Sequence, residues 1–316
     1  MTPEFPELAS CQICPQLCGA NRFKSIGFCG ADHRLRINLA QLHHGEEPVL
    51  SGSQGSGTIF FSHCNLRCVY CQNYPISQQG WGAYSTLEEC SELMLRLQTS
   101  GAHNVNLVSP THYTLQLIKS IQLAREKGLG VPVVWNSNAY ESVETLQRLR
   151  GLVDIYLPDF KYAHAAYSLK YSSARDYPAV ALAALKEMRF QAGDLEIGQD
   201  GIATKGLLVR HLVLPNRLSG TKKALYILHE SFGPHLALSL MAQYYPAGRA
   251  AEYVELSRPL HHGEYADALE TAAQLGFTRI FAQELSSQPE WTPAFSAQGL
   301  PLDQKPRHFR GKESHV

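Results

Sequence analysis

Short apolar runs alternate with longer amphipathic stretches over most of the chain, and this pattern predicts strands that are each followed by a helix. The expected strands are residues 58–61, 104–108, 131–135, 153–157, 207–214 and 236–241, with a further strand at 279–282. Helices are expected at about residues 85–100, 113–127, 141–150, 176–192, 221–232 and 263–275. In the first helix, Ser85 and Glu88 have the spacing of a capping box, and Gly101 marks the end.

A regular alternation of strands and helices implies parallel strands joined by right-handed crossovers. Six such units favour an α/β fold, a partial (βα)6 TIM-like barrel, over a closed eight-fold barrel. A doubly wound open sheet is the main structural alternative. In each of these folds the active site lies beyond the carboxyl ends of the strands, so the residues that follow the strands are the first candidates.

The alternation begins only after a Cys-, Gly- and turn-rich stretch, which indicates a division of the chain. We expect a Cys-rich N-terminal metal-binding segment at residues 1–56 and the barrel at residues 57–284. Residues 285–316 are rich in Ser, Gln, Pro and charged residues, a composition typical of an extended or disordered tail.

Charge narrows the range of partners. The chain has 28 Lys+Arg and 28 Asp+Glu, a formal net charge of +0, so it lacks the basic excess on which nucleic-acid binding rests. Its start lacks the basic and apolar runs of a signal peptide, and no segment has the ~18 consecutive apolar residues of a membrane span. The expected location is therefore the cytoplasm, with no membrane partner.

Cysteine is the unusual feature of the composition, because disulfides are rare in the cytosol. Seven of the eight cysteines fall in the first quarter of the chain at short spacings, which favours metal ligation. The exception is Cys90, which lies in the first predicted helix and is expected to be a small core residue.

Cys64, Cys68 and Cys71 form a C-x3-C-x2-C motif directly after the first predicted strand. Thiolates suit iron-sulfur clusters, and four of them would ligate every iron of a [4Fe-4S] cluster. Three leave one iron open for a substrate or cosubstrate, in the way that a catalytic zinc keeps one position free. Taken alone, the motif also allows a zinc site or unrelated thiols.

The surroundings of the motif narrow that choice. Asn65 and Leu66 follow the first cysteine, the aromatic Tyr70 precedes the last, and Asn73 stands just after it. In these features the chain resembles the radical S-adenosylmethionine superfamily, in particular the group similar to pyruvate formate-lyase activating enzyme. The resemblance in the order of strands and helices covers about residues 57–283.

The resemblance implies a [4Fe-4S] cluster on the three cysteines, with S-adenosylmethionine chelated to the open iron. It implies an oxidoreductase that reductively cleaves S-adenosylmethionine to a 5′-deoxyadenosyl radical, which abstracts hydrogen from a substrate that the sequence does not identify. A one-electron donor such as flavodoxin or ferredoxin is the expected partner. Activation of a glycyl-radical enzyme is the most specific form of this function, and a different protein or small-molecule substrate is equally open.

The resemblance also assigns roles at the strand ends. The superfamily often has a Gly-Gly-Glu type tripeptide after the second strand, whereas this chain has Ser109-Pro110-Thr111, whose carbonyls and threonine hydroxyl are the expected replacements. Asp159 and Lys161 look like the Asp-x-Lys of the activating-enzyme group, and His211 looks like a histidine of its active site. The cofactor-binding candidates are Tyr70, Ser109, Thr111, Asn136, Asn138 and Asp159, and the catalytic candidates are Lys161 and His211.

Cys11, Cys14, Cys18 and Cys29 form a second motif, C-x2-C-x3-C-x10-C. Four thiolates indicate a closed metal site, which is either structural zinc or an auxiliary [4Fe-4S] cluster. Further ligand types follow in a polar stretch, at His43, His44, Glu46 and Glu47. Because adjacent pairs in such a stretch are usually solvated, we expect these four side chains to face water.

A second hypothesis is that the chain is not an enzyme. The chain would then be a non-catalytic iron-sulfur or zinc-binding module that contacts nucleic acid or protein. The neutral net charge and the three-cysteine motif both count against this alternative.

Overall fold

The computed structural model describes residues 4–285, 293–299 and 307–309. Its centre is an 11-stranded sheet in the order β10-β9-β8-β6-β5-β4-β2-β1-β11, with β3 paired to β1 and β7 paired to β8. The strands are β1 (Leu35–His43), β2 (Ser56–Phe61), β3 (Ala83–Ser85), β4 (Val105–Val108), β5 (Val133–Ser137), β6 (Ile155–Pro158), β7 (Glu196–Ile197), β8 (Ala203–Leu212), β9 (Ala237–Met241), β10 (Ile280–Ala282) and β11 (Arg307–Phe309).

Helices occupy most of the connections. The α-helices are α1 (Pro48–Ser51), α2 (Tyr74–Ser77), α3 (Leu87–Thr99), α4 (Thr114–Glu126), α5 (Val143–Gln147), α6 (Ala165–Ser172), α7 (Tyr177–Ala192), α8 (Thr221–Phe232) and α9 (His262–Gln274). Short 3-10 helices span Pro6–Ser10, Thr111–Tyr113, Pro215–Arg217, Ala250–Glu252 and Val254–Leu256.

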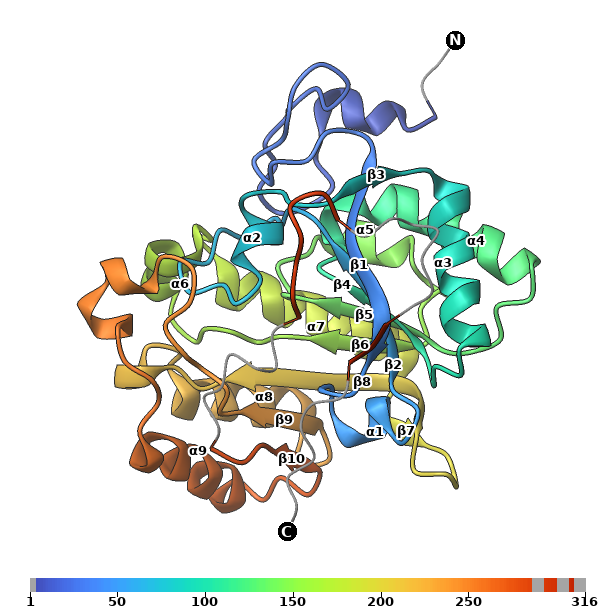
Figure 1. Ribbon diagram of the computed structural model, residues 1–316. Coiled ribbons are helices and arrows are strands. Elements are labelled where there is room, and N and C mark those ends of the chain that lie inside the picture. Colours follow the sequence, from blue (N-terminus) through green and yellow to red (C-terminus); the bar gives the residue numbers. More distant parts are fainter. Residues whose placement is uncertain (1–3, 286–292, 300–306, 310–316) are drawn as a thin grey trace.

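The run of strands from β2 to β10 is parallel at every pairing along the main path of the sheet. Helical connections join successive members of this run, with α3 and α4 near one end of it and α8 and α9 near the other (Figure 1). The predicted α/β fold, a partial barrel of parallel strands, is confirmed: the sheet is open and mostly parallel, and all seven expected strands are present.

Strand β1 is an element that the sequence pattern does not predict. It runs antiparallel to β2 and brings part of the Cys-rich segment into the same sheet. Its buried positions include the polar Asn38 and Gln41, which interrupt the apolar run by which strands are recognised. The domain boundary near residue 57 stays a prediction, since β1 and β2 share one sheet.

The N-cap of helix α3 lies one residue later in the sequence than predicted. Thr86 is the N-cap, and its side chain accepts a hydrogen bond from the Glu89 backbone N–H at 3.1 Å. The Glu89 carboxylate in turn accepts from the Thr86 N–H at 2.8 Å. The predicted pair of Ser85 and Glu88 has the same spacing, so spacing alone does not separate the two candidates.

Two apolar layers hold the sheet. The larger core packs Trp135 and Tyr156 of the strands against α3, α4, α7 and α8, and it contains Cys90, which is fully buried as predicted. On the opposite face, Val49 and Leu50 of α1 pack against Ile155 and neighbouring strand residues. Helix α1 thereby joins the stretch after β1 to the middle of the sheet.

The predicted tail at 285–316 lies largely outside the described residues. Within its described parts, β11 pairs in parallel with β1. In the part of the chain that the structure describes, no helix combines the length and apolar character needed to span a membrane.

Candidate active site

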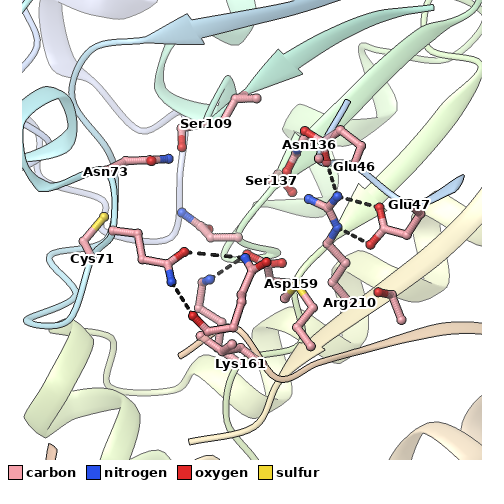
Figure 2. Close-up of a pocket in the computed structure, with 18 of the residues that line it drawn as sticks. Glu46, Glu47, Cys71, Asn73, Ser109, Asn136, Ser137, Asp159, Lys161 and Arg210 are labelled. Atoms are coloured by element: carbon pink, nitrogen blue, oxygen red, sulfur yellow. Dashed lines mark hydrogen bonds and ion pairs between the residues drawn. The ribbon is translucent and has the colours of Figure 1, made fainter. Parts of the chain in front are cut away.

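A cavity of ≈ 290 Å³ lies at the carboxyl ends of the parallel strands, where the fold predicts the active site. Residues from β2, β4, β5, β6, β8 and β9 or the loops after them line it. Figure 2 shows Cys71 and Arg210 on opposite sides of the cavity, with Asp159 and Lys161 between them. Among the predicted site residues, Cys64, Cys68, Cys71, Tyr70, Ser109, Asn136, Asn138, Asp159 and Lys161 line the cavity.

The loop of residues 64–71, here called the cluster loop, presents its three cysteine sulfurs to the cavity. One side-chain donor from elsewhere contacts each sulfur. The pairs are Asn138 Nδ2 to Cys64 Sγ at 3.4 Å, Ser172 Oγ to Cys68 Sγ at 2.9 Å and Ser77 Oγ to Cys71 Sγ at 3.2 Å. Helix α2, the end of α6 and the turn after β5 therefore support the three sulfurs separately.

Burial keeps these thiols protonated in the absence of a metal. It raises the pKa of Cys64 to about 12, with the neighbouring Cys68 adding to the effect, and raises the pKa of Cys68 to about 11. Burial also raises the pKa of Cys71. Because metal ligation needs thiolates, binding of a cluster at this loop would release protons.

The donor set fits a [4Fe-4S] cluster. Cys64, Cys68 and Cys71 are the cysteines that line the cavity among the described residues, so one iron would lack a protein thiolate. Thiolates are ligands that suit such a cluster.

Asp159 and Lys161 form an ion pair at the floor of the cavity, with 2.6 Å between Oδ2 and Nζ. Burial alone would lower the pKa of Lys161, but Asp159 and the nearby Cys68 hold it above its ordinary value. Tyr177 of α7 fixes the backbone here, because its hydroxyl donates to the Asp159 carbonyl and accepts from the Lys161 N–H. No short-range pattern in the sequence pointed to Tyr177.

Asn138 connects the turn after β5 to the cluster loop. Besides its contact with Cys64, its Nδ2 donates to the Asn65 side chain at 2.7 Å. Asn65 Nδ2 donates in turn to the Tyr140 carbonyl at 2.6 Å. Asn65, a residue of the family resemblance, thus has a local structural task, which is to anchor the loop between the first two cysteines.

Of the segment Ser109-Pro110-Thr111, which was expected to replace the Gly-Gly-Glu tripeptide, only part lies at the cavity. Ser109 lines it, whereas Thr111 is buried below and donates to Glu141 Oε1 at 2.9 Å. Trp135 and Ser137 also donate to the Glu141 carboxylate. The structure therefore places Thr111 as a support for the strand ends, and the sequence missed Glu141, which it assigned to a helix.

His211 lies away from the cavity. It is fully buried, with Nδ1 at 2.6 Å from the Phe160 carbonyl and Nε2 at 3.0 Å from Thr221 Oγ1. Burial lowers its pKa to about 4, so the ring is neutral. Because alternate residues of a strand face opposite sides, Arg210 rather than His211 faces the cavity. The geometry gives no support to the predicted catalytic role.

The expectation that Glu46 and Glu47 are solvated is wrong. Both carboxylates are buried against Arg210, whose Nε lies 2.8 Å from Glu47 Oε1 and whose Nη2 contacts Glu46 (Figure 2). His43 also lines the cavity and is largely buried. The local sequence could not reveal this group of buried charges, because its cation, Arg210, lies 163 residues away on β8.

Tyr70 is buried at the cavity wall. Its ring packs edge-on against Tyr162 and Tyr244, at centroid distances of 6.4 and 6.0 Å. The four N-terminal cysteines are not among the residues that line the cavity in the described structure.

Comparison with known proteins agrees with this site. The model of the radical SAM superfamily, SAM being S-adenosylmethionine, matches residues 58–189. An uncharacterized protein of Methanocaldococcus jannaschii is 30% identical over 282 residues, which are 86% of this chain and 77% of that protein. Two solved structures are more distant. Methylornithine synthase has 16% identity and a TM-score of 0.48, over 69% of this chain and 60% of its own.

The second solved structure is the hydrogenase maturase HydG of Carboxydothermus hydrogenoformans, with 12% identity and a TM-score of 0.49 over 69% of this chain and 50% of its own. The present chain thus spans less than two thirds of either solved chain. The family match covers the cluster loop and the Asp159–Lys161 pair, and membership implies a [4Fe-4S] cluster and S-adenosylmethionine. The chain belongs to the radical S-adenosylmethionine superfamily.

Proposed function

We propose that the protein is an oxidoreductase that cleaves S-adenosylmethionine reductively and uses the resulting radical to abstract hydrogen from a substrate in the cavity. One observation carries the proposal. The three thiols of the cluster loop open into the same cavity as the Asp159–Lys161 ion pair and the amides of Asn136 and Asn138.

Cys64, Cys68 and Cys71 would hold the [4Fe-4S] cluster. When bound, this cluster supplies the electron for one-electron cleavage of S-adenosylmethionine to a 5′-deoxyadenosyl radical. The chain itself orients the reactants. Asn138, Ser172 and Ser77 hold the three sulfurs.

The charge of the cavity suits the cosubstrate. Glu46, Glu47 and Asp159 contribute three carboxylates against the two cations of Lys161 and Arg210, which leaves one net negative charge. S-adenosylmethionine carries one net positive charge, from its sulfonium and ammonium against one carboxylate. We assign the Asp159–Lys161 pair to its amino-acid group, since the two ion pairs are complementary.

Within this proposal, a glycyl-radical protein is the first substrate class to test. The support is the Asp159-Phe160-Lys161 sequence, which resembles the activating enzymes and which lies at the cavity floor. A flavodoxin or ferredoxin is the proposed electron donor.

The experiment is an assay for 5′-deoxyadenosine after anaerobic reconstitution with iron and sulfide, reduction by dithionite and addition of S-adenosylmethionine. The wild type and Cys90→Ala, whose buried thiol lies in α3 within the core, are expected to form the product. Cys71→Ser is expected to form none. Lack of product with reconstituted wild-type protein would refute the enzymatic function and leave the non-catalytic module as the better account.

A further inference from the structure

The fold brings together four cysteines that the proposed reaction does not use, here called the N-terminal quartet: Cys11, Cys14, Cys18 and Cys29. None forms a disulfide in the structure. Cys18 is exposed, and the other three are buried.

Backbone hydrogen bonds fold residues 11–20 into a closed turn that brings two members of the quartet together. The Cys11 N–H donates to the Ala20 carbonyl and the Gly19 N–H donates to the Cys11 carbonyl, each at 3.0 Å. Cys18 Sγ lies 3.9 Å from the Cys11 carbonyl oxygen.

A buried cation beside the quartet provides an independent observation. Arg22 is 1% exposed, and its Nη1 lies 3.9 Å from Cys11 Sγ. Its other hydrogen bonds go to the backbone carbonyls of Asp32 and His112, and its guanidinium lies over the Tyr113 ring, 5.7 Å from the centroid. Within the described ranges, no carboxylate forms an ion pair with it, and an unpaired buried charge is strongly unfavourable. Thiolates of a metal centre would supply the missing negative charge.

Two glycines lie beside the sulfurs of the quartet. A Cβ on Gly27 would be in ordinary van der Waals contact with Cys29 Sγ at 3.5 Å and with Cys18 Sγ at 3.6 Å, so both sulfurs lie next to the Gly27 backbone. Gly30 has a φ of +90°, and a Cβ there would come within 2.8 Å of His63, the residue before Cys64. The quartet therefore packs directly against the start of the cluster loop.

Hydrogen bonds join the two loops as well. Gln16 Nε2 donates to the Asn65 carbonyl at 3.0 Å, and Arg67 Nη1 donates to the Phe28 carbonyl at 3.3 Å. Figure 1 shows the N-terminal loops at the same end of the molecule as α2, which follows the cluster loop. The quartet thus forms a second thiol centre on the outer side of the cluster loop.

We propose that Cys11, Cys14, Cys18 and Cys29 hold an auxiliary [4Fe-4S] cluster, closed by four protein thiolates. The quartet packs directly against the cluster loop, and its four thiolates would ligate every iron of a second [4Fe-4S] cluster. The metal content of the protein distinguishes such a cluster from a zinc ion bound by the same four thiolates. With every iron ligated by the protein, this centre would not bind S-adenosylmethionine.

The test measures metal content and does not depend on S-adenosylmethionine cleavage. In anaerobically reconstituted wild type we expect about eight iron atoms per chain, and about four in the double variant Cys14→Ser, Cys18→Ser, which keeps two thiols of the quartet. Cys90→Ala, which removes a buried thiol outside the quartet, is the matched control with about eight. Full iron content in the double variant would overturn the proposal.

A second variant isolates the auxiliary centre. The triple variant Cys64→Ser, Cys68→Ser, Cys71→Ser is expected to keep about four irons with equal sulfide and to lose them when Cys14→Ser and Cys18→Ser are added. One zinc per chain without iron in the triple variant would overturn the cluster assignment, as would protein free of metal with unchanged circular dichroism. If the wild type makes no 5′-deoxyadenosine, the proposed function fails while the metal result still stands by itself.

Discussion

Each sulfur of the cluster loop has its own side-chain donor, and the three donors come from different elements. Hydrogen bonds to cluster sulfurs withdraw charge and raise the reduction potential. The shortest of the three contacts is that from Ser172 to Cys68, at 2.9 Å. Removal of the Ser172 hydroxyl is therefore expected to change the reduction potential of the cluster more than removal of either of the other two donors.

Ser172→Ala should lower the reduction potential of the cluster without loss of iron. The expected shift is on the order of 40 mV, the one-electron equivalent of a hydrogen bond of about 1 kcal/mol. A potentiometric titration followed by electron paramagnetic resonance measures it. Ser168→Ala, in the same helix but without a contact to a cysteine sulfur, is the control. An unchanged potential in Ser172→Ala would exclude this residue from tuning the cluster.

Lys161→Ala should reduce the rate of 5′-deoxyadenosine formation and weaken S-adenosylmethionine binding. Loss of one charge-assisted contact is expected to cost about ten- to a hundredfold. Lys170→Ala removes an exposed lysine that pairs with Glu255 and should leave the rate unchanged. Equal rates in both variants, at equal iron content, would contradict a cofactor-binding role for Lys161.

At this scale the sequence predicted the residues that directly follow strand ends. Cys64, Cys68, Cys71, Asp159 and Lys161 all lie where that rule places them. The prediction failed where a partner distant in the sequence determines whether a side chain is buried, as Arg210 does for the Glu46 and Glu47 carboxylates. The donors Ser77 and Ser172 gave no signal, because a serine in a helix is common and its neighbour is set only by the tertiary fold.

At the scale of elements, local chemistry sets the start of α3, whereas a buried charge cluster joins α1 to β8. The α3 cap uses two residues three positions apart. The charge cluster links the stretch before α1 to Arg210 across most of the sequence. The sequence predicted the helix cap to within one residue. It did not predict the buried charge cluster.

Thr86→Ala should destabilise the protein by about 1 kcal/mol, since it leaves the Glu89 N–H without its cap acceptor. Chemical denaturation measures the change in the free energy of unfolding. Glu88→Gln alters the competing capping candidate, which is exposed, and should have an effect below about 0.5 kcal/mol. A larger effect of Glu88→Gln than of Thr86→Ala would show that Ser85 and Glu88, the predicted pair, cap the helix.

Arg210→Met should destabilise the protein by about 3–5 kcal/mol near neutral pH, because two buried carboxylates lose their cation. Burial alone would raise the pKa of Glu47, but Arg210 holds it below the usual 4.5. In the wild type this depressed pKa stabilises the fold above about pH 4.5, and the stabilisation is lost as the pH falls further. The variant has a raised Glu47 pKa instead, so its deficit should shrink on acidification.

Urea denaturation near pH 7 and near pH 5 compares the two proteins. Arg34→Met, which removes a half-exposed partner of Asp32, is the control and should cost less than about 1 kcal/mol at either pH. A deficit of Arg210→Met that grows towards pH 5 would show that the cation does not serve to compensate the buried carboxylates.

At the scale of the whole molecule, parallel strands bring the cluster loop, the Asp159–Lys161 pair and Arg210 to one cavity. The alternation of strands and helices, and with it the α/β fold class, followed from hydrophobic periodicity. The covering strand β1 and the packing of the N-terminal quartet on the cluster loop did not, since both depend on contacts between distant segments. The central claim is that the three-cysteine cluster leaves one iron open to S-adenosylmethionine.

Electron paramagnetic resonance of the reduced protein, recorded before and after S-adenosylmethionine is added, shows whether one iron of this cluster is open. We expect a changed spectrum of the cluster in the wild type and in Cys18→Ser, and no signal from this cluster in Cys68→Ser. A spectrum that stays the same at saturating S-adenosylmethionine, in protein with full iron content, would contradict it.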